Sequence, residues 1–190
     1  VLCQDRPQND YLAALRRFSH RLQKIADSKK CLFSKLRITV FLKMLSRFLA
    51  RIENDYTAIQ VPKRKITHND ITKSNLLFKN GNFAAFLDMD SVTLSWPGRD
   101  CAEFIVSTVR RFKFWRSRRK AIKQWYACMD KRLHFSREEY LYGLNVYYLY
   151  RICNYIRRRR YLSGFLKLYN FAQFIKLHKV IVNELYRLKK

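Results

Sequence analysis

Residues that break regular structure are scarce along this chain, and their scarcity limits its fold more than any other feature does. The 190 residues include only 4 Gly and 3 Pro. Between these breakers, apolar side chains recur every three or four residues, as at Leu12, Leu15 and Leu22, which is the spacing of one helix face. With 48% apolar residues, the chain can bury a core. We therefore predict one mainly α-helical domain over residues 1–190.

The apolar spacing divides the chain into a series of helices. Residues 1–9 are expected to form a loop. Two amphipathic helices with core-facing apolar sides then follow, one from Asp10 to Ile25 and one from Leu36 to Ile52. Residues 57–67 are then expected to be extended, and residues 91–99 to form a loop. Three further helical stretches follow, at about 100–132 with a break near Trp115, at 137–158 and at 163–188.

Two of these helices begin with the pattern of a capping box. In a capping box, the side chain of the first residue accepts from the backbone N–H three residues later, and the side chain of that later residue accepts from the backbone N–H of the first. Asp100 with Glu103 is one candidate pair, and Ser136 with Glu139 is the other. Both pairs precede apolar runs, so we predict helix starts at both places.

One short segment breaks the helical pattern. Leu76–Phe78 and Phe83–Leu87 are apolar runs, and the four residues between them include Asn80-Gly81. Asn-Gly between two such runs is the strongest short-range signal for a β-hairpin. The expected fold class is therefore mainly α with a small β-hairpin.

The charge of the chain is extreme, with 40 Lys and Arg against 14 Asp and Glu, a formal net charge of +26. Such a surface attracts phosphates, whether on a nucleotide, a nucleic acid, an anionic lipid or an anionic substrate. Four of the rare acids fall within 31 residues: Asp70, Asp88, Asp90 and Asp100. Carboxylates gathered in so basic a chain indicate a place where a cation is held.

The five cysteines show no metal-ligand spacing. They are interpreted as reduced thiols in a cytoplasmic compartment. No apolar stretch is long enough to be a transmembrane segment.

The segment from His68 to Asp88 combines these signals. A loop carboxylate, Asp70, is followed five residues later by an amide, Asn75, and the predicted hairpin ends beside Asp88. Because the hairpin returns the chain to the loop, the three side chains can converge on one point. Phosphoryl transfer uses such a set, with one carboxylate to accept the proton of the acceptor hydroxyl, and an amide oxygen and a second carboxylate to hold Mg²⁺.

The strings HNDITKSNLLF and FLDMD resemble the HxDxxxxN and DxD signatures of the aminoglycoside phosphotransferase and choline kinase superfamily, which has a protein-kinase-like fold. The stretch LDMDSVTLSWPGRD is similar to the spore-coat kinase-like branch of that superfamily. The resemblance implies an ATP- and Mg²⁺-dependent kinase and gives each matching residue a role.

By this resemblance Asp70 is the catalytic base, Asn75 and Asp88 bind the metal, and His68 braces the catalytic loop. Asp100 supports that loop from the following helix. Two further residues keep alternatives. Asp90 is either a second metal contact or a solvated acid, and Lys73 either touches a phosphate or is a solvated loop lysine.

The resemblance assigns residues 66–100 to a catalytic loop and metal hairpin, and residues 101–190 to a helical substrate-side region. Together they match the C-terminal large lobe of the kinase-like fold, with the N-terminal β-rich lobe absent. The four glycines, at positions 81, 98, 143 and 164, make no Gly-rich nucleotide loop. The chain is therefore expected to be a truncated or split enzyme that lacks its N-terminal lobe as a partner, and to be poorly active alone.

The later helices are basic and aromatic, which favours an anionic or sugar-like hydroxyl acceptor over a polycationic one. The candidate substrate-side residues are Arg116, Arg118, Arg119 and Lys120. Two other functions remain open. The chain could be a catalytically weak scaffold such as a spore-coat protein, or a module that binds nucleic acid or an anionic membrane through its basic helices.

Overall fold

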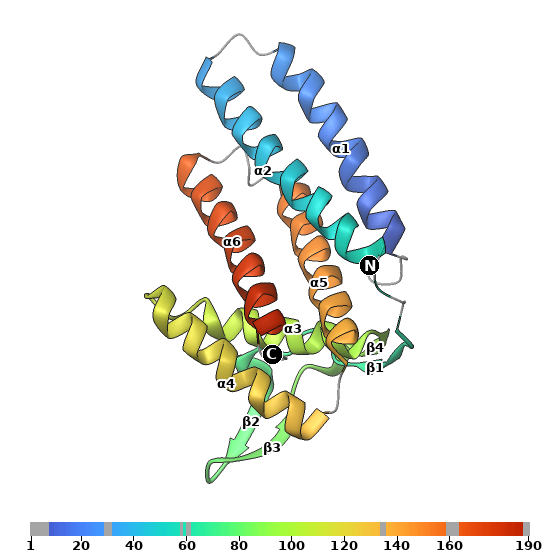
Figure 1. Cartoon of the computed structure of the whole chain (residues 1–190), viewed down its shortest axis with the longest axis vertical. Helices are drawn as coiled ribbons and strands as arrows, with labels where there is room; N and C mark the ends of the chain where they lie inside the picture. Colours follow the sequence, from blue (N-terminus) through green and yellow to red (C-terminus); the bar gives the residue numbers. More distant parts are fainter. Residues whose placement is uncertain are drawn as a thin grey trace. The chain divides into compact units, whose positions relative to one another are not determined.

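The computed structural model describes residues 8–28, 32–57, 59, 62–133, 136–158 and 164–187 (Figure 1). Most of these residues are helical, and the strands form two antiparallel sheets of two strands each. The predicted mainly α fold with a small hairpin is therefore confirmed. The expected loop at residues 1–9 lies largely outside the described residues, and helix already begins at Gln8.

The elements follow one another in this order: α1 (Gln8–Ser28), α2 (Leu32–Thr57), β1 (Lys65–Thr67), β2 (Leu76–Lys79), β3 (Asn82–Phe86), β4 (Thr93–Ser95), α3 (Pro97–Val109), α4 (Trp115–Leu133), α5 (Arg137–Arg157) and α6 (Phe165–Arg187). Short 3₁₀ turns lie at Lys73–Asn75 and Met89–Ser91. The chain divides into two compact units, Val1–Ala58 with Tyr148–Lys176, and Ile59–Tyr147 with Leu177–Lys190. The boundaries fall inside α5 and α6, and the single domain remains a prediction.

The first unit is built on the antiparallel pair α1 and α2 (Figure 1). The predicted apolar faces supply its core, where Leu15, Leu45 and Ile52 are buried. Arg16 and Glu53 join the two helices in an ion pair with an N–O distance of 2.6 Å.

Three positions of the predicted apolar faces are exposed, and their assignment to the core was wrong: Ile25, Leu36 and Val40. They lie in the last turn of α1 and the first turns of α2. Periodicity gives the direction of a helix face but cannot tell which turns of that face have a neighbour.

Aromatic side chains complete the core of this unit. Phe41 of α2 lies 4.9 Å from Phe171 of α6 between ring centroids, and Tyr148 of α5 stacks on Phe174 of α6 at 4.2 Å. Such ring pairs contribute about 0.5–1.5 kcal/mol each beyond the area they bury. The Tyr-rich and Phe-rich composition of the later helices is thus used, in this unit, for packing.

The second unit contains both sheets. The Asn-Gly hairpin is confirmed, since β2 pairs with β3 and the turn residues Asn80 and Gly81 have φ of 52° and 78°. A second sheet was not predicted. β1 pairs with β4, from Lys65 opposite Ser95 to Thr67 opposite Thr93. The expected loop at 91–99 was therefore wrong in part, because three-residue strands are too short to show a periodic pattern.

The helix predicted from residue 100 is two helices, α3 and α4, separated at 110–114, so the break near Trp115 is confirmed. The capping box at Asp100 and Glu103 was wrong. Helix α3 begins at Pro97, and Trp96 occupies the N-cap position without a side-chain bond. Proline suits the first helical position because that position needs no N–H donor, and the Asp100 carboxylate is used elsewhere.

The capping box of α5 is confirmed. The Ser136 N–H donates to Glu139 Oε2 and the Glu139 N–H donates to Ser136 Oγ, both at 3.0 Å. The two bonds satisfy backbone donors that the first turn of a helix otherwise leaves open.

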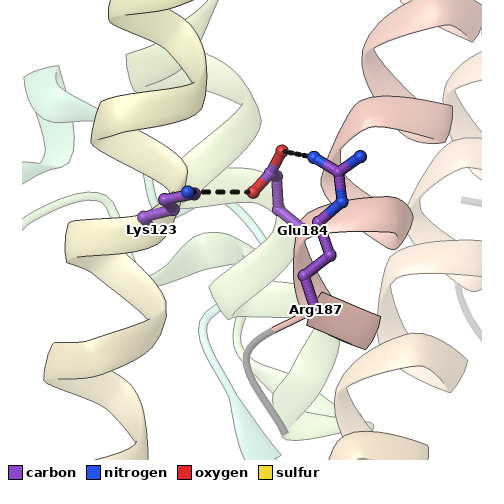
Figure 2. Close-up of polar contacts among 3 residues, drawn as sticks. All are labelled: Lys123, Glu184 and Arg187. Atoms are coloured by element: carbon purple, nitrogen blue, oxygen red, sulfur yellow. Dashed lines mark hydrogen bonds and ion pairs between the residues drawn. The ribbon is translucent and has the colours of Figure 1, made fainter. Parts of the chain in front are cut away.

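A buried acid joins α4 to the last turns of α6 (Figure 2). The Glu184 side chain is 2% exposed, and its carboxylate lies 3.9 Å from Lys123 Nζ of α4 and 3.2 Å from Arg187 Nη1. A carboxylate withdrawn from water needs such positive partners, because losing one leaves an uncompensated charge. The ion pairs, with the buried Ile122 and Tyr126, fix which face of α4 points inward.

No helix in the described ranges has the length and apolar character needed to cross a bilayer.

Candidate functional site

The loop between β1 and β2 is held at its start by one carboxylate. Asp100, buried in the first turn of α3, accepts hydrogen bonds from the backbone N–H groups of His68 and Asn69, each at 2.7 Å. Burial raises the pKa of Asp100 above its ordinary value, and the two hydrogen bonds partly offset that rise. The two short bonds fix the beginning of the loop to α3.

Asn69 also fixes this loop by hydrogen bonds, and the sequence analysis did not identify it. Its φ is 61°, in the left-handed region that Asn tolerates better than most residues. Its side-chain amide donates to the carbonyl oxygens of Thr67 and Ser91, both at 3.2 Å. Asn69 thereby joins the end of β1 to the turn that follows β3. The signal in the sequence was an Asn between two chemically important residues, in a loop that had to turn sharply.

His68 joins the same loop to the hairpin. Its Nε2 lies 2.9 Å from the carbonyl oxygen of Leu87, which can only accept, so Nε2 carries the proton. The ring is buried and lies 5.4 Å from the ring of Phe86 at the end of β3. These contacts run from the loop to the residues just before Asp88.

Asp70 and Asn75 lie directly against each other. The side-chain amide of Asn75 donates to both the backbone carbonyl and the carboxylate Oδ2 of Asp70, each at 2.9 Å. Because Nδ2 is committed to Asp70, the Oδ1 atom of Asn75 points away from that carboxylate and can accept from another group. The loop between them is closed by hydrogen bonds from Thr72 N–H to the Asp70 carbonyl at 2.9 Å and from Asn75 N–H to the Thr72 carbonyl at 3.0 Å.

The hairpin brings the chain back to this loop. The Leu87 N–H donates to the Asn75 carbonyl at 2.9 Å, so the residue before Asp88 is bonded to Asn75 itself. Asp88 has a φ of 57°. Left-handed backbone in a residue other than Gly costs on the order of 1–3 kcal/mol and is concentrated at functional sites. Two of the three such residues in the described part of the chain, Asn69 and Asp88, border this loop.

The donor groups suit a hard divalent cation. No cluster of three or more His, Cys, Asp or Glu that could hold a metal occurs within the described residues. Mg²⁺ is bound by one or two carboxylates together with phosphates and water. Asp88 is exposed, and within the described part its carboxylate has no hydrogen bond or ion pair. Asn75 Oδ1 and the Asp88 carboxylate are oxygen atoms of the kind that would hold such an ion, and their role as metal ligands remains a prediction.

Residues 3–140, well over half of the chain, match the model of the phosphotransferase enzyme family. The chain belongs to this family. No curated protein and no solved structure matches it.

In this phosphotransferase the remaining predicted residues lie in different settings. Lys73 and Asp90 are exposed in the two 3₁₀ turns, one on each side of the hairpin. On α4, Arg116, Arg119 and Lys120 are exposed. Arg118 instead donates from Nε to the Phe112 carbonyl at 2.8 Å and lies over the Trp115 ring. Arg118 therefore stabilises the start of α4. The roles assigned to all these residues remain predictions.

Proposed function

We propose that this chain carries out ATP- and Mg²⁺-dependent phosphoryl transfer to the hydroxyl of a small anionic or sugar-like acceptor. The observation that carries the proposal is the hydrogen-bonded pair of Asp70 and Asn75, with the Leu87–Asn75 bond returning Asp88 beside them. Family membership supports phosphotransfer in general. The side-chain oxygens of Asn75 and Asp88 support the proposed use of Mg²⁺.

The proposed step follows from the positions of these groups. The acceptor hydroxyl oxygen forms a bond to the γ-phosphorus, the bond between that phosphorus and the β–γ bridging oxygen breaks, and ADP leaves. Asp70 takes the hydroxyl proton, and the amide of Asn75 orients its carboxylate. Asn75 Oδ1 and Asp88 would hold Mg²⁺, which neutralises charge on the phosphates when bound. His68, Asn69 and Asp100 keep the loop in place without touching the reacting atoms.

The acceptor is proposed to be anionic because few acids accompany the basic residues of the helices after residue 100. From 104 to 129 the chain has no Asp or Glu and many Lys and Arg. A polycationic acceptor would meet repulsion there, whereas a phosphorylated or acidic sugar would be attracted. ATP as phosphate donor fits a cytoplasmic reaction, and the absence of a disulfide at Cys101 and Cys128 supports that compartment.

The test is phosphoryl transfer from ATP at millimolar concentration, assayed with Mg²⁺ against sugar phosphates, neutral sugars and aminoglycosides. The wild-type chain should turn over slowly and prefer the anionic acceptors. Asp70→Asn should lower the rate by about 10²–10⁴-fold, because general-base catalysis contributes that much. Glu138→Gln, at an exposed acid of α5, is the matched control and should keep the wild-type rate. An Asp70→Asn variant as active as that control would contradict the proposal.

A further inference from the structure

A basic and aromatic surface lies outside the candidate site. It comprises the connection between α3 and α4 and the outer face of the first turns of α4, and we call it the 110–120 surface. Seven of its eleven residues are Arg or Lys, in the order RRFKFWRSRRK. None of them takes part in the chemical step proposed at Asp70, although their charge belongs to the basic region proposed to attract an anionic acceptor.

The cations of this surface point outward. Arg110, Arg111 and Lys113 are exposed in the connection, and Arg116, Arg119 and Lys120 are exposed on α4. Arg116 and Lys120 follow an i, i+4 spacing, so they lie on the same face of α4. The buried Ile122 and Tyr126 lie on a different face of the helix.

Two apolar rings stand among these cations. Phe112 is 40% exposed and Phe114 is 66% exposed. The connection that carries them is held in a definite shape, since Phe112 N–H donates to the Val109 carbonyl at 3.1 Å and Arg118 binds the Phe112 carbonyl. The Lys113 ammonium lies 5.7 Å from the centroid of the Phe114 ring, and neither ring has a polar atom that could hydrogen-bond to water.

We propose that the 110–120 surface docks on an anionic lipid bilayer, with Phe112 and Phe114 entering the boundary between headgroups and acyl chains. Segments that lie in the membrane interface combine Lys and Arg with Phe and Trp in this way, and their binding adds apolar burial to attraction by anionic lipid. The charge complementarity is strong because no acid occurs between Glu103 and Asp130.

A single-stranded nucleic acid is the competing partner, because it also binds cations and stacks on aromatic rings. The two partners make different demands on the rings. A bilayer requires apolar side chains that can be buried, and phenylalanine meets that demand without a hydrogen-bonding group. The bilayer is also favoured because Phe114 projects with two thirds of its area exposed from a connection between helices.

The experiment is sedimentation of the full chain with vesicles of phosphatidylcholine alone or of equal parts phosphatidylcholine and phosphatidylglycerol. Binding should require phosphatidylglycerol. Arg116→Gln with Arg119→Gln and Lys120→Gln should weaken partitioning roughly 100-fold, since each surface cation contributes about fivefold. The charge-matched control changes three exposed cations of α2, Lys35→Gln, Lys43→Gln and Arg47→Gln, and should lose much less.

The ring contribution is tested separately. Phe112→Ser with Phe114→Ser leaves the net charge unchanged and should weaken partitioning by about tenfold or more. Its control is Leu32→Ser with Phe33→Ser, at two exposed apolar residues of α2, which should have little effect. Circular dichroism and thermal melting of each variant exclude misfolding as the cause.

Three outcomes would overturn the proposal. One is equal binding to both vesicle types, and another is equal losses in the surface variants and their controls. The third is displacement of the chain from vesicles by single-stranded RNA, with RNA binding that depends on the same cations and rings. Because no measurement here involves ATP, the outcome is independent of whether phosphotransfer occurs at Asp70.

Discussion

At the scale of single residues, the carboxylate of Asp100 has the largest structural influence on the candidate site. It accepts from two consecutive backbone N–H groups of the loop that carries Asp70. Both donors belong to buried residues, so neither has water as an easy alternative. Two roles were considered for Asp100 from the sequence, helix cap and support of the loop, and its hydrogen bonds go to the loop.

Replacing Asp100 by Ala should therefore destabilise the fold. Two buried N–H groups would lose their acceptor, at about 1–3 kcal/mol each, so the free energy of unfolding should fall by about 2–6 kcal/mol. Asp100→Asn keeps one acceptor oxygen and should lose roughly half as much. Urea denaturation followed by circular dichroism measures both. Equal stability of wild type and Asp100→Ala would show that the two bonds do not hold the loop.

Cys101, the next residue, offers a chemical readout of the same region. Burial raises the pKa of the Cys101 thiol to about 12, and the nearby Asp100 carboxylate adds to the rise. The raised pKa favours the neutral thiol, so at about pH 8 roughly one molecule in ten thousand carries the reactive thiolate. Cys128 on α4 is exposed.

Iodoacetamide labelling at about pH 8, mapped by mass spectrometry, should modify Cys128 well before Cys101. In denaturant the two cysteines should react at similar rates, which controls for differences in peptide recovery. Early labelling of Cys101 in the folded chain would contradict the burial of this thiol.

Candidate residues with chemistry in their side chains could be proposed from sequence, and those with backbone roles could not. Asp70, Asn75 and Asp88 were proposed because their spacing across a hairpin is specific, and their roles remain predictions. Asn69 was missed because its function depends on a left-handed φ and on two carbonyl partners from other segments. Neither property has a periodic pattern in sequence.

At the scale of elements, α3 and α5 approach each other through two glycines. A Cβ atom added to Gly143 would meet the backbone of Gly98 and Arg99, and one added to Gly98 would meet the backbone of Glu139 and Tyr140. Backbone atoms cannot rotate aside as a side chain can. This approach holds the first turn of α3, and with it Asp100, against the start of α5.

Gly143→Ala should consequently destabilise the protein, although Ala is the better helix former. In an open helix interior the change would stabilise by about 1 kcal/mol, whereas overpacking here should cost about 1–3 kcal/mol or more. The change in melting temperature shows directly whether Gly143→Ala stabilises or destabilises the protein. Gly81→Ala is the control, since the hairpin turn has open space and only the positive φ opposes a side chain. A higher melting temperature for Gly143→Ala would contradict the close packing.

Long elements were predicted better than short ones. The helices and the Asn-Gly hairpin have patterns that extend over many residues or a specific turn dipeptide. The pairing of β1 with β4 joins residues about 28 positions apart through three-residue strands, and no local pattern specifies such a partner. The ends of helices also shifted, as at Pro97, because the carboxylate expected at the cap had a tertiary partner.

At the scale of the whole molecule, the net charge of +26 means that the few acids of the site have many more cations than anions around them in the chain. Exposed carboxylates at Asp88 and Asp90 would be drawn to the surrounding lysines and arginines. In the described part, neither forms an ion pair. A carboxylate can bind a metal ion when no Lys or Arg side chain already pairs with it. The sequence alone could not show whether Asp88 and Asp90 have such pairs.

The central claim is that Asp70, Asn75 and Asp88 meet around one divalent cation. The most direct measurement uses Mn²⁺ as a paramagnetic substitute for Mg²⁺ in the ¹⁵N-labelled full chain, with a non-hydrolysable ATP analogue at millimolar concentration. We predict that amide signals of residues 70–75 and 87–90 broaden first, that Mg²⁺ competes, and that Asn75→Ala with Asp88→Asn removes the effect. Broadening that is spread over other acids, or that persists unchanged in the double variant, would contradict the shared metal site.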